Sequence, residues 1–265
     1  DYVKINYSSS LIFIWSDCKL YFYVSLRNLS FVKGKLYLIP VTLGGNDFRT
    51  VIPDNVLDIT KRLRVFVVED IRSARRYLRL IDREFPIDDT MFFELNEHSE
   101  ENDISHYLDP LMDGSDTGLL SEAGMPGIAD PGSKLIAIAH RKRITITPLT
   151  GPSSILLALI SSGLNGQKFV FHGYLPVKTS EREAKIRELE KNSRKGYAQI
   201  FMETPYRNQK ILESVLSICK NETHLCIAAD LTLPTEFIRT MKISDWKNDK
   251  PDLDKRPAVF IIQYN

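Results

Sequence analysis

Twelve residues near the middle of the chain carry almost no side-chain bulk. The stretch 121–132 reads Ser-Glu-Ala-Gly-Met-Pro-Gly-Ile-Ala-Asp-Pro-Gly, with three glycines, two prolines and two alanines. The apolar run 117–120 before it predicts a strand, and the pattern of 133–140 after it predicts an amphipathic helix. So little bulk leaves backbone N–H and C=O groups open to a ligand. The order of strand, loop and helix predicts a pocket at the carboxyl edge of a sheet, the alternative being a buried turn that only connects two elements.

A second loop of the same kind follows closely along the chain. The alternating residues 144–148 predict another strand, and Leu-Thr-Gly-Pro-Ser-Ser at 149–154 leads into a helix that opens at Ile155. We expect Pro152 to occupy the first turn of this helix, whose free N–H groups then face the same edge as the first loop. The two strands are expected to be adjacent, so that both loops contribute to one pocket.

Together the two loops resemble the S-adenosylmethionine (AdoMet) loops of the tetrapyrrole methylase superfamily, the class III AdoMet-dependent methyltransferases. They are most similar to its ribosomal small-subunit RNA (cytidine-2′-O)-methyltransferase branch, and the resemblance spans residues 34–247. It implies a two-domain α/β fold with the cofactor cleft between the domains. The N-terminal domain, expected at 34–149, is a mainly parallel sheet with helices on both faces. The C-terminal domain, expected at 150–265, is a mixed sheet with helices.

Hydrophobic runs along the chain agree with this division. Before residue 150, short strands alternate with helices, which predicts a parallel sheet. After it, strands and hairpins outnumber crossover helices, which predicts a mixed sheet. The expected strands lie at 35–40, 65–68, 90–95, 117–120, 144–148, 198–202, 224–229, 236–241 and 258–262, and expected helices include 56–63, 102–112, 153–162 and 178–195.

Composition excludes several classes of protein. With 43% hydrophobic and 26% charged residues, the chain is typical of a soluble globular protein, and no apolar run is long enough to span a membrane. A net charge of +1 is unlike a general nucleic-acid coat, so any RNA contact has to use local patches. Cys18, Cys219 and Cys226 form no metal-binding pair and no disulfide framework, which favours the cytoplasm and argues against zinc.

Residues 1–33 precede the region of resemblance. They are rich in Tyr, Phe and Ser, show no clear period and lack the pattern of a signal peptide. We interpret them as an extension outside the fold. A strand or hairpin peculiar to this chain and an upstream start site that adds non-native sequence are both open alternatives.

The resemblance implies AdoMet as the cofactor and no metal, because the sulfonium already activates the methyl group. Backbone groups of the two loops are expected to hold its adenosine and amino-acid parts, with Met125, Ile128 and Met202 flanking the adenine. The residues expected to bind the cofactor are Leu43, Gly44, Ser121, Ala123, Gly124, Met125, Pro126, Gly127, Ile128, Ala129, Thr150, Gly151, Ser153, Tyr174 and Met202.

Charged residues that follow two predicted strands indicate the acceptor side. Glu69 opens a Glu-Asp-x-Arg sequence like that of the resembling family, and residues 203–207 read Glu-Thr-Pro-Tyr-Arg where the family has Glu-Ser-Pro-His-Arg. We expect Glu69 or Glu203 to orient or deprotonate the nucleophile, with Arg207 also lining this side.

A row of arginines continues from the first of these segments. Arg72, Arg76, Arg79 and Arg83 recur at helical spacing, and Arg72 and Arg76 are expected to contact the phosphates of the substrate. The alternative is an ordinary solvated helix face. The resemblance further implies ribosomal RNA or the small subunit as substrate, and a homodimer.

The chain departs from the family pattern at several places. Residues 42–46 read Thr-Leu-Gly-Gly-Asn instead of Pro-x-Gly-Asn-Leu, Glu122 replaces an aspartate, and 228–233 read Ala-Ala-Asp-Leu-Thr-Leu instead of Ala-Arg-Glu-Leu-Thr-Lys. A cofactor-binding homologue without catalysis is therefore one alternative. A tetrapyrrole C-methyltransferase is another, although the chain lacks the Gly-x-Gly-x-Gly-Asp sequence that such enzymes carry after the first strand.

Overall fold

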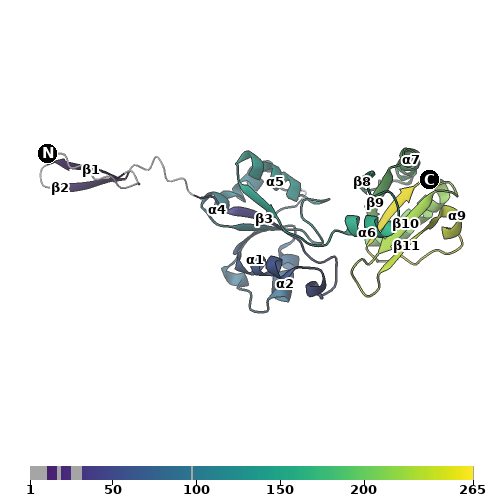
Figure 1. The fold of residues 1–265 in the computed structure, drawn as a ribbon, viewed down its shortest axis with the longest axis horizontal. Coiled ribbons are helices and arrows are strands. Elements are labelled where there is room, and N and C mark those ends of the chain that lie inside the picture. The colour runs from purple at the N-terminus through teal and green to yellow at the C-terminus, as the bar shows by residue number, and fades with distance from the viewer. Residues whose placement is uncertain (1–10, 17–18, 25–31, 97, 265) are drawn as a thin grey trace.

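The computed structural model describes residues 11–16, 19–24, 32–96 and 98–264. From residue 32 onward, these residues form two bodies, each built on a five-stranded sheet flanked by helices (Figure 1). One sheet is wholly parallel and the other is mixed, as the sequence predicts. The two-domain α/β architecture is therefore confirmed.

The first sheet is covered on both faces. Its strands are β3 (Lys35–Ile39), β4 (Val65–Val68), β5 (Met91–Glu94), β6 (Thr117–Leu120) and β7 (Thr145–Pro148). Its helices are α1 (Asp54–Arg62), α2 (Ile71–Ile81), α3 (Glu101–His106), α4 (Asp109–Met112) and α5 (Gly132–Arg141), with 3-10 turns at Phe48–Thr50 and Ile87–Asp89. Successive side chains of β4 point to opposite faces, so Phe66 and Val68 pack with α1 and α2, whereas Val67 packs with α3, α4 and α5.

The order of the strands corrects one prediction. The sheet runs β5-β4-β6-β3-β7, so β6 and β7 are not adjacent, because β3 lies between them and pairs with both. Strand order depends on packing between segments that are distant in the sequence. Leu36 and Ile39 of β3 are fully buried, Leu36 in the hydrophobic core on one face of the sheet and Ile39 in the core on the other. All five strands are parallel, so the loops after β3, β6 and β7 still leave from one edge of the sheet.

Two helix predictions also differ from the structure. The helix expected at 102–112 is split into α3 and α4, because Pro110 has no N–H to donate to the carbonyl of His106. Helix α2 ends at Ile81, so Arg83 lies beyond it, whereas Arg72 and Arg76 lie on the exposed surface of the helix.

The second sheet has the order β11-β10-β12-β9-β8. Its strands are β8 (Phe169–Tyr174), β9 (Ala198–Glu203), β10 (His224–Ala229), β11 (Phe237–Lys242) and β12 (Ala258–Gln263). β8 and β9 are parallel, and the other neighbours are antiparallel. The helices of this half are α6 (Ser154–Ser162), α7 (Thr179–Ser193), α8 (Asn208–Ile218) and α9 (Ile243–Trp246), with a 3-10 turn at Pro205–Arg207.

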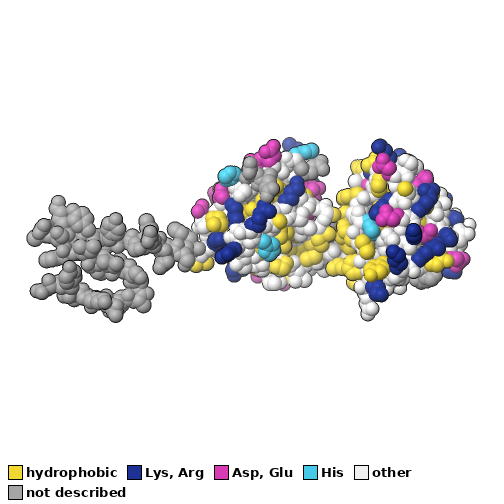
Figure 2. All heavy atoms as spheres, turned by 90° about the horizontal axis from the view of Figure 1, so that it is seen from above, with side chains coloured by type: hydrophobic (Ala, Val, Ile, Leu, Met, Phe, Trp, Pro, Cys, Tyr) yellow, Lys and Arg dark blue, Asp and Glu magenta, His cyan; other side chains and the backbone are white. Residues whose placement is uncertain are grey.

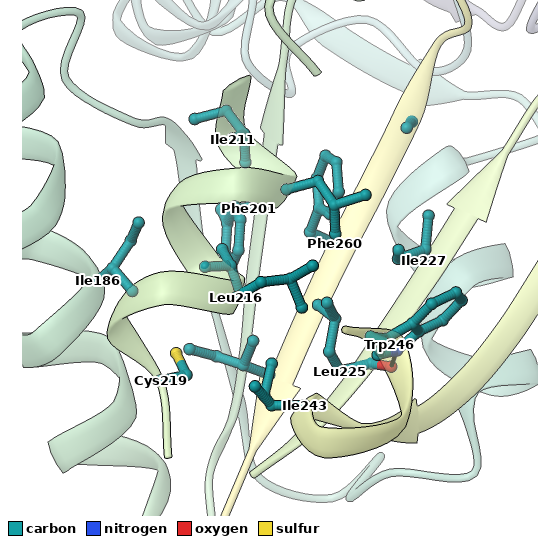
Figure 3. Packing of buried hydrophobic residues seen from close by; sticks show 14 of the residues in the cluster. Ile186, Phe201, Ile211, Leu216, Cys219, Leu225, Ile227, Ile243, Trp246 and Phe260 are labelled. Atoms are coloured by element: carbon teal, nitrogen blue, oxygen red, sulfur yellow. Dashed lines mark hydrogen bonds between the residues drawn. The ribbon is translucent and has the colours of Figure 1, made fainter. Parts of the chain in front are cut away.

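A large buried cluster holds this half together (Figure 3). Phe201 and Phe260 stack on neighbouring strands with ring centroids 5.6 Å apart, and the buried Trp246 donates its indole N–H to the carbonyl of Leu225 at 2.8 Å. Helix α8, which the sequence analysis did not predict, adds Ile211 and Leu216 to the cluster. The cluster fixes one face of β9 and so the direction in which the strand delivers Glu203.

The described residues of the N-terminal segment form two paired strands, in line with one of the two alternatives considered for it. β1 (Leu11–Ser16) and β2 (Lys19–Val24) pair antiparallel with each other. Residues 1–10, 17–18 and 25–31 lie outside the described part of the chain. Among the described helices, none combines the length and apolar character that crossing a bilayer requires.

Candidate functional site

Three loops of the first sheet meet at Gly124. The Val41 N–H donates to the Gly124 carbonyl at 2.9 Å, which joins the loop after β3 to the loop after β6. A Cβ atom on Gly124 would lie 3.1 Å from Cδ2 of Leu43 and 3.3 Å from the carbonyl oxygen of Pro152, and its φ of 71° also favours glycine. The loop after β7 therefore reaches the same point. The expected convergence of the two loops is present, with the loop after β3 between them.

Asp130 holds the loop after β6 in shape. Its carboxylate accepts hydrogen bonds from the N–H groups of Gly127, at 2.8 and 2.9 Å, and Gly132, at 2.7 Å. Burial raises the pKa of this carboxyl, and the two N–H groups partly offset the rise by lowering it. The chain bends through positive φ at Gly127 and Ala129 on the way. A carboxylate directed at its own backbone thus leaves the remaining groups of the loop free for a ligand.

The loop after β7 begins a helix differently from the sequence prediction. The N-cap of α6 is Ser153, whose hydroxyl accepts from the Leu156 N–H at 3.5 Å, and Pro152 lies before the helix. Serine competes well for the N-cap because its oxygen satisfies a free N–H of the first turn. Gly151 approaches the end of β3 so closely that a Cβ there would lie 2.3 Å from the ring of Pro40.

Beside these loops lies a cleft of about 450 Å³, within the range of roughly 300–1,000 Å³ usual for small-molecule sites. Residues of both sheets line it, and Figure 2 shows hydrophobic side chains gathered where the two bodies face each other. The lining consists of Leu43, Glu69, Ser121, Glu122, Ala123, Gly124, Met125, Ile128, Ala129, Asp130, Ser153, Ser154, Ile155, Tyr174, Met202, Glu203, Thr204, Pro205, Ala228, Leu231, Pro257, Ala258 and Val259.

Most residues proposed from the sequence are brought together here. Those that line the cleft are Leu43, Glu69, Ser121, Ala123, Gly124, Met125, Ile128, Ala129, Ser153, Tyr174, Met202 and Glu203. Those outside the lining are Gly44, Arg72, Arg76, Pro126, Gly127, Thr150, Gly151 and Arg207. Gly127 and Gly151 instead shape the loops, through the Asp130 hydrogen bonds and the approach to Pro40.

The polar wall of the cleft is acidic. Four carboxylates line it, those of Glu69, Glu122, Asp130 and Glu203, and within the described part of the chain no lysine or arginine does. Burial raises the pKa of Glu69, and the charges of Glu122 and Asp130 raise it further. Burial, then the charges of Glu203 and Glu69, raise the pKa of the Tyr174 hydroxyl. A cation is therefore favoured in this cleft over an anion.

Glu203 is the most enclosed of these carboxylates, with its side chain 1% exposed. One oxygen accepts from the Thr204 N–H at 2.9 Å, and the other lies 2.7 Å from Nη2 of Arg207. Arg207, which does not line the cleft, thus balances the charge of Glu203. Within the described residues, no group of three or more His, Cys, Asp or Glu side chains is arranged to hold a metal ion.

A turn at 230–236 forms part of the site that the sequence analysis did not predict. Asp230 accepts from Nε of Arg256 at 2.7 Å and from the Thr235 hydroxyl at 2.9 Å, while its own φ is positive at 52°. From this turn Leu231 lines the cleft, and Leu233 touches the first body, since its Cδ2 would lie 3.0 Å from a Cβ on Gly45. The turn therefore joins the two bodies beside the cleft.

Comparison with known proteins places the chain in a family. A family model for Tetrapyrrole (Corrin/Porphyrin) Methylases matches residues 35–246. Ribosomal RNA small subunit methyltransferase I of Vibrio cholerae is 32% identical over 230 residues, covering 86% of this chain and 76% of that protein. The protein of the same name from Escherichia coli O157:H7 is 28% identical over 237 residues, covering 87% and 78%.

Solved structures agree at the level of the fold. The methyltransferase CobJ is similar with a TM-score of 0.58 and 16% identity, covering 87% of this chain and 94% of that one. Cobalt precorrin-4 methyltransferase, a cobalamin biosynthetic enzyme, gives a TM-score of 0.56 at 15% identity, covering 86% and 94%. Because the family model covers the first sheet and four of the five strands of the second, and the relatives match along most of their length, the chain belongs to the tetrapyrrole methylase family and is an AdoMet-dependent methyltransferase.

Proposed function

We propose that the cleft binds AdoMet and that the enzyme methylates a ribose 2′-hydroxyl of small-subunit ribosomal RNA. The observation that carries the cofactor assignment is the convergence of three side-chain-poor loops at Gly124, beside the cleft that both sheets line. The names of the relatives support the RNA assignment.

The chemistry of the lining fits this cofactor. Exposed backbone around Ala123 and Ala129 offers donors and acceptors to the adenosine and amino-acid parts, while Met125, Ile128 and Met202 offer apolar contacts to the adenine. The four carboxylates suit a positively charged ligand. When bound, AdoMet supplies a methyl group already activated by its sulfonium, so the protein has to align the acceptor oxygen rather than create the electrophile.

Glu69 is the better placed of the two candidate bases. One oxygen of Glu203 accepts from the Thr204 N–H and the other is ion-paired with Arg207 without a hydrogen bond, so Glu203 acts as a positioning group. Glu69 lines the same cleft, and its raised pKa brings it closer to the working pH of a general base. We therefore assign Glu69 to orient the acceptor hydroxyl and take up its proton.

Contacts to the RNA backbone are assigned outside the cleft. Arg72 and Arg76 are exposed on α2, which begins directly after Glu69 and its neighbour Asp70. Arginine there meets phosphate at the rim, while the acidic cleft admits the cofactor and a single nucleotide.

Two experiments test the proposal in sequence. Isothermal titration with AdoMet tests the cleft, and transfer of a radiolabelled methyl group to undermethylated small ribosomal subunits tests the acceptor. Nuclease digestion and analysis of the labelled nucleoside should then give a 2′-O-methyl nucleoside. Label on a base would exclude the ribose as acceptor. AdoMet binding without label in any subunit, or label in a tetrapyrrole precursor instead, would overturn the RNA assignment and leave cofactor binding intact.

The Glu69 assignment has its own test. Glu69→Gln should lower kcat by about a hundredfold or more, as expected for loss of a general base, and leave AdoMet bound. Exposed Glu213 on α8, changed to Gln, is the matched control and should behave as wild type. An unchanged kcat in the Glu69 variant would show that Glu69 is not a general base and that the rate comes from alignment of the acceptor with AdoMet.

We also propose that the enzyme is a cytoplasmic homodimer. Leu156 and Ile160 are exposed on α6, and Phe169 and Val170 are exposed on the edge strand β8, so apolar surface is available for a second copy. Light scattering during gel filtration should give twice the mass of one chain, and the Ile160→Glu variant should have the mass of a single chain. A single-chain mass for the wild type would overturn the dimer.

A further inference from the structure

Tyr206 is the most exposed aromatic ring among the side chains that the structure describes. It is 76% exposed, and within the described residues its side chain makes no hydrogen bond and no ring contact. An aromatic ring contributes to a fold chiefly by burial. The fold therefore does not account for the ring of Tyr206.

The backbone under this ring is held firmly at the mouth of the cleft. Tyr206 is the middle residue of the 3-10 turn Pro205–Arg207, which the Arg207 N–H closes onto the Thr204 carbonyl at 2.9 Å. Thr204 and Pro205 line the cleft, and helix α8 begins at the residue after Arg207. A side chain with two rotatable bonds on such a turn has a small entropic cost of ordering when it binds a ligand.

A second exposed tyrosine lies at the same mouth. Tyr174 lines the cleft, is 55% exposed, and ends β8, where it pairs with Met202 of β9. Tyr206 follows on the continuation of that partner strand, so two adjacent parallel strands each deliver a tyrosine at their carboxyl ends. Because the charged groups that line the cleft are carboxylates, the tyrosines of this wall offer a ring face for stacking, and contacts to phosphate are left to Arg72 and Arg76 on α2.

We propose that Tyr206 stacks on a nucleobase of the acceptor RNA next to the ribose that is methylated. Single-stranded RNA is recognised largely by stacking of splayed bases on aromatic side chains, and a tyrosine face accepts any base. The inference rests on the proposed RNA methylation and adds the residue that places the target nucleotide. Tyr206 is thus a substrate-binding residue of the acceptor side.

The test is a series of substitutions assayed with protein-free small-subunit RNA and with whole subunits. Tyr206→Ala should raise the KM for RNA about tenfold, as expected for loss of one stacked base, and leave the Kd for AdoMet unchanged. Tyr206→Phe and Tyr206→Trp keep a ring face and should stay within twofold of wild type. Tyr197→Ala is the matched control, because Tyr197 precedes β9 at the end of the strand away from the cleft and is 39% exposed.

The possible results distinguish a failure of the stacking inference from a failure of the proposed RNA methylation. If the wild type methylates RNA and Tyr206→Ala has an unchanged KM, stacking is overturned and the function stands. An equal loss in Tyr206→Phe would assign the effect to the hydroxyl, and a loss seen with whole subunits alone would assign it to a ribosomal protein; either overturns stacking. A wild type that binds AdoMet and methylates no RNA would overturn both proposals. AdoMet titration of each variant shows whether it is folded.

Discussion

The two walls of the cleft differ in the groups that they present to a ligand. The wall from the first sheet consists chiefly of the loops after β3, β6 and β7, whose small residues expose backbone around Gly124, and Glu69 joins it from the end of β4. The wall from the second sheet consists of strand ends and the turn 230–236, and it presents side chains such as Tyr174, Met202 and Glu203. Backbone groups offer the same hydrogen-bond donors and acceptors whatever the sequence, whereas side chains determine which methyl acceptor is bound.

The walls are also stabilised differently. Asp130 folds its loop by accepting from two backbone N–H groups within the same short stretch. The turn 230–236 is held instead by Arg256, which binds Asp230 from a distant part of the chain. We therefore expect changes in the loops after β3, β6 and β7 to act on AdoMet binding, and changes that loosen the second wall to act more on methyl transfer.

Asp130→Asn should have the largest effect on AdoMet binding. The amide oxygen can still accept from both N–H groups, but the amide nitrogen would face the Gly127 N–H in place of Oδ2. The remaining bonds also lose the charge that makes such bonds worth roughly 1.5–3 instead of 0.5–1.5 kcal/mol. We expect the Kd for AdoMet in isothermal titration to rise by at least tenfold. Asp58→Asn on the exposed surface of α1 serves as the control. An unchanged Kd would show that the loop keeps its shape without the carboxylate.

Gly151→Ala should have the next largest effect, through a clash. The new Cβ would lie 2.3 Å from the ring of Pro40, which is too rigid to rotate away, and such overpacking costs about 1–3 kcal/mol. We expect a lower melting temperature and weaker AdoMet binding. Gly166→Ala is the matched control, because a Cβ there has no atom within 4 Å. Equal behaviour of the two variants would show that the close approach to β3 is dispensable.

These two variants concern the part of the site that the sequence predicts well. Glycine, proline and alanine in the loop 121–132 indicate a local need for small side chains, and the hydrophobic runs indicate the strands beside the loop. The placement of β3 between β6 and β7 could not be predicted, because pairing between distant strands leaves no local pattern. The contact of Arg256 with Asp230 is equally non-local, and so is the approach of Leu233 to Gly45.

Arg256→Ala tests the second wall and should have an intermediate effect. It leaves Asp230, whose side chain is 9% exposed, without its cation, at a cost of roughly 1.5–3 kcal/mol. We expect kcat for RNA methylation to fall more than AdoMet affinity, with partial recovery in Arg256→Lys. A loss of AdoMet binding as large as that of Asp130→Asn would remove the distinction between the walls.

Leu233→Ala should have a smaller effect on the same wall. Leu233 is half-buried and bridges the two bodies at Gly44 and Gly45, so truncation removes an apolar contact while the hydrogen bonds of the turn remain. We expect a modest rise in the dissociation rate of AdoMet, measured by stopped-flow displacement, with the melting temperature nearly unchanged. Exposed Met112 on α4, changed to Ala, is the control. An unaltered rate would mean that the bridge does not influence cofactor exchange.

The smallest expected effect is on stability, and it comes from Glu69, which follows β4 and lies on the first wall together with the carboxylates of Glu122 and Asp130. Burial and then the charges of Glu122 and Asp130 raise its pKa in the folded protein above the ordinary 4.5. The folded state therefore binds this proton more tightly than the unfolded chain does, so the stabilisation is present below pH 4.5 and is lost as the pH rises through the folded-state pKa. At neutral pH the ionised carboxylate opposes folding, and Glu69→Gln should melt at a higher temperature than wild type, by an amount that shrinks on acidification. Glu122→Gln should lower the pKa of Glu69 and reduce that difference. A melting difference independent of pH would show that Glu69 faces solvent and that the charges of Glu122 and Asp130 do not act on it.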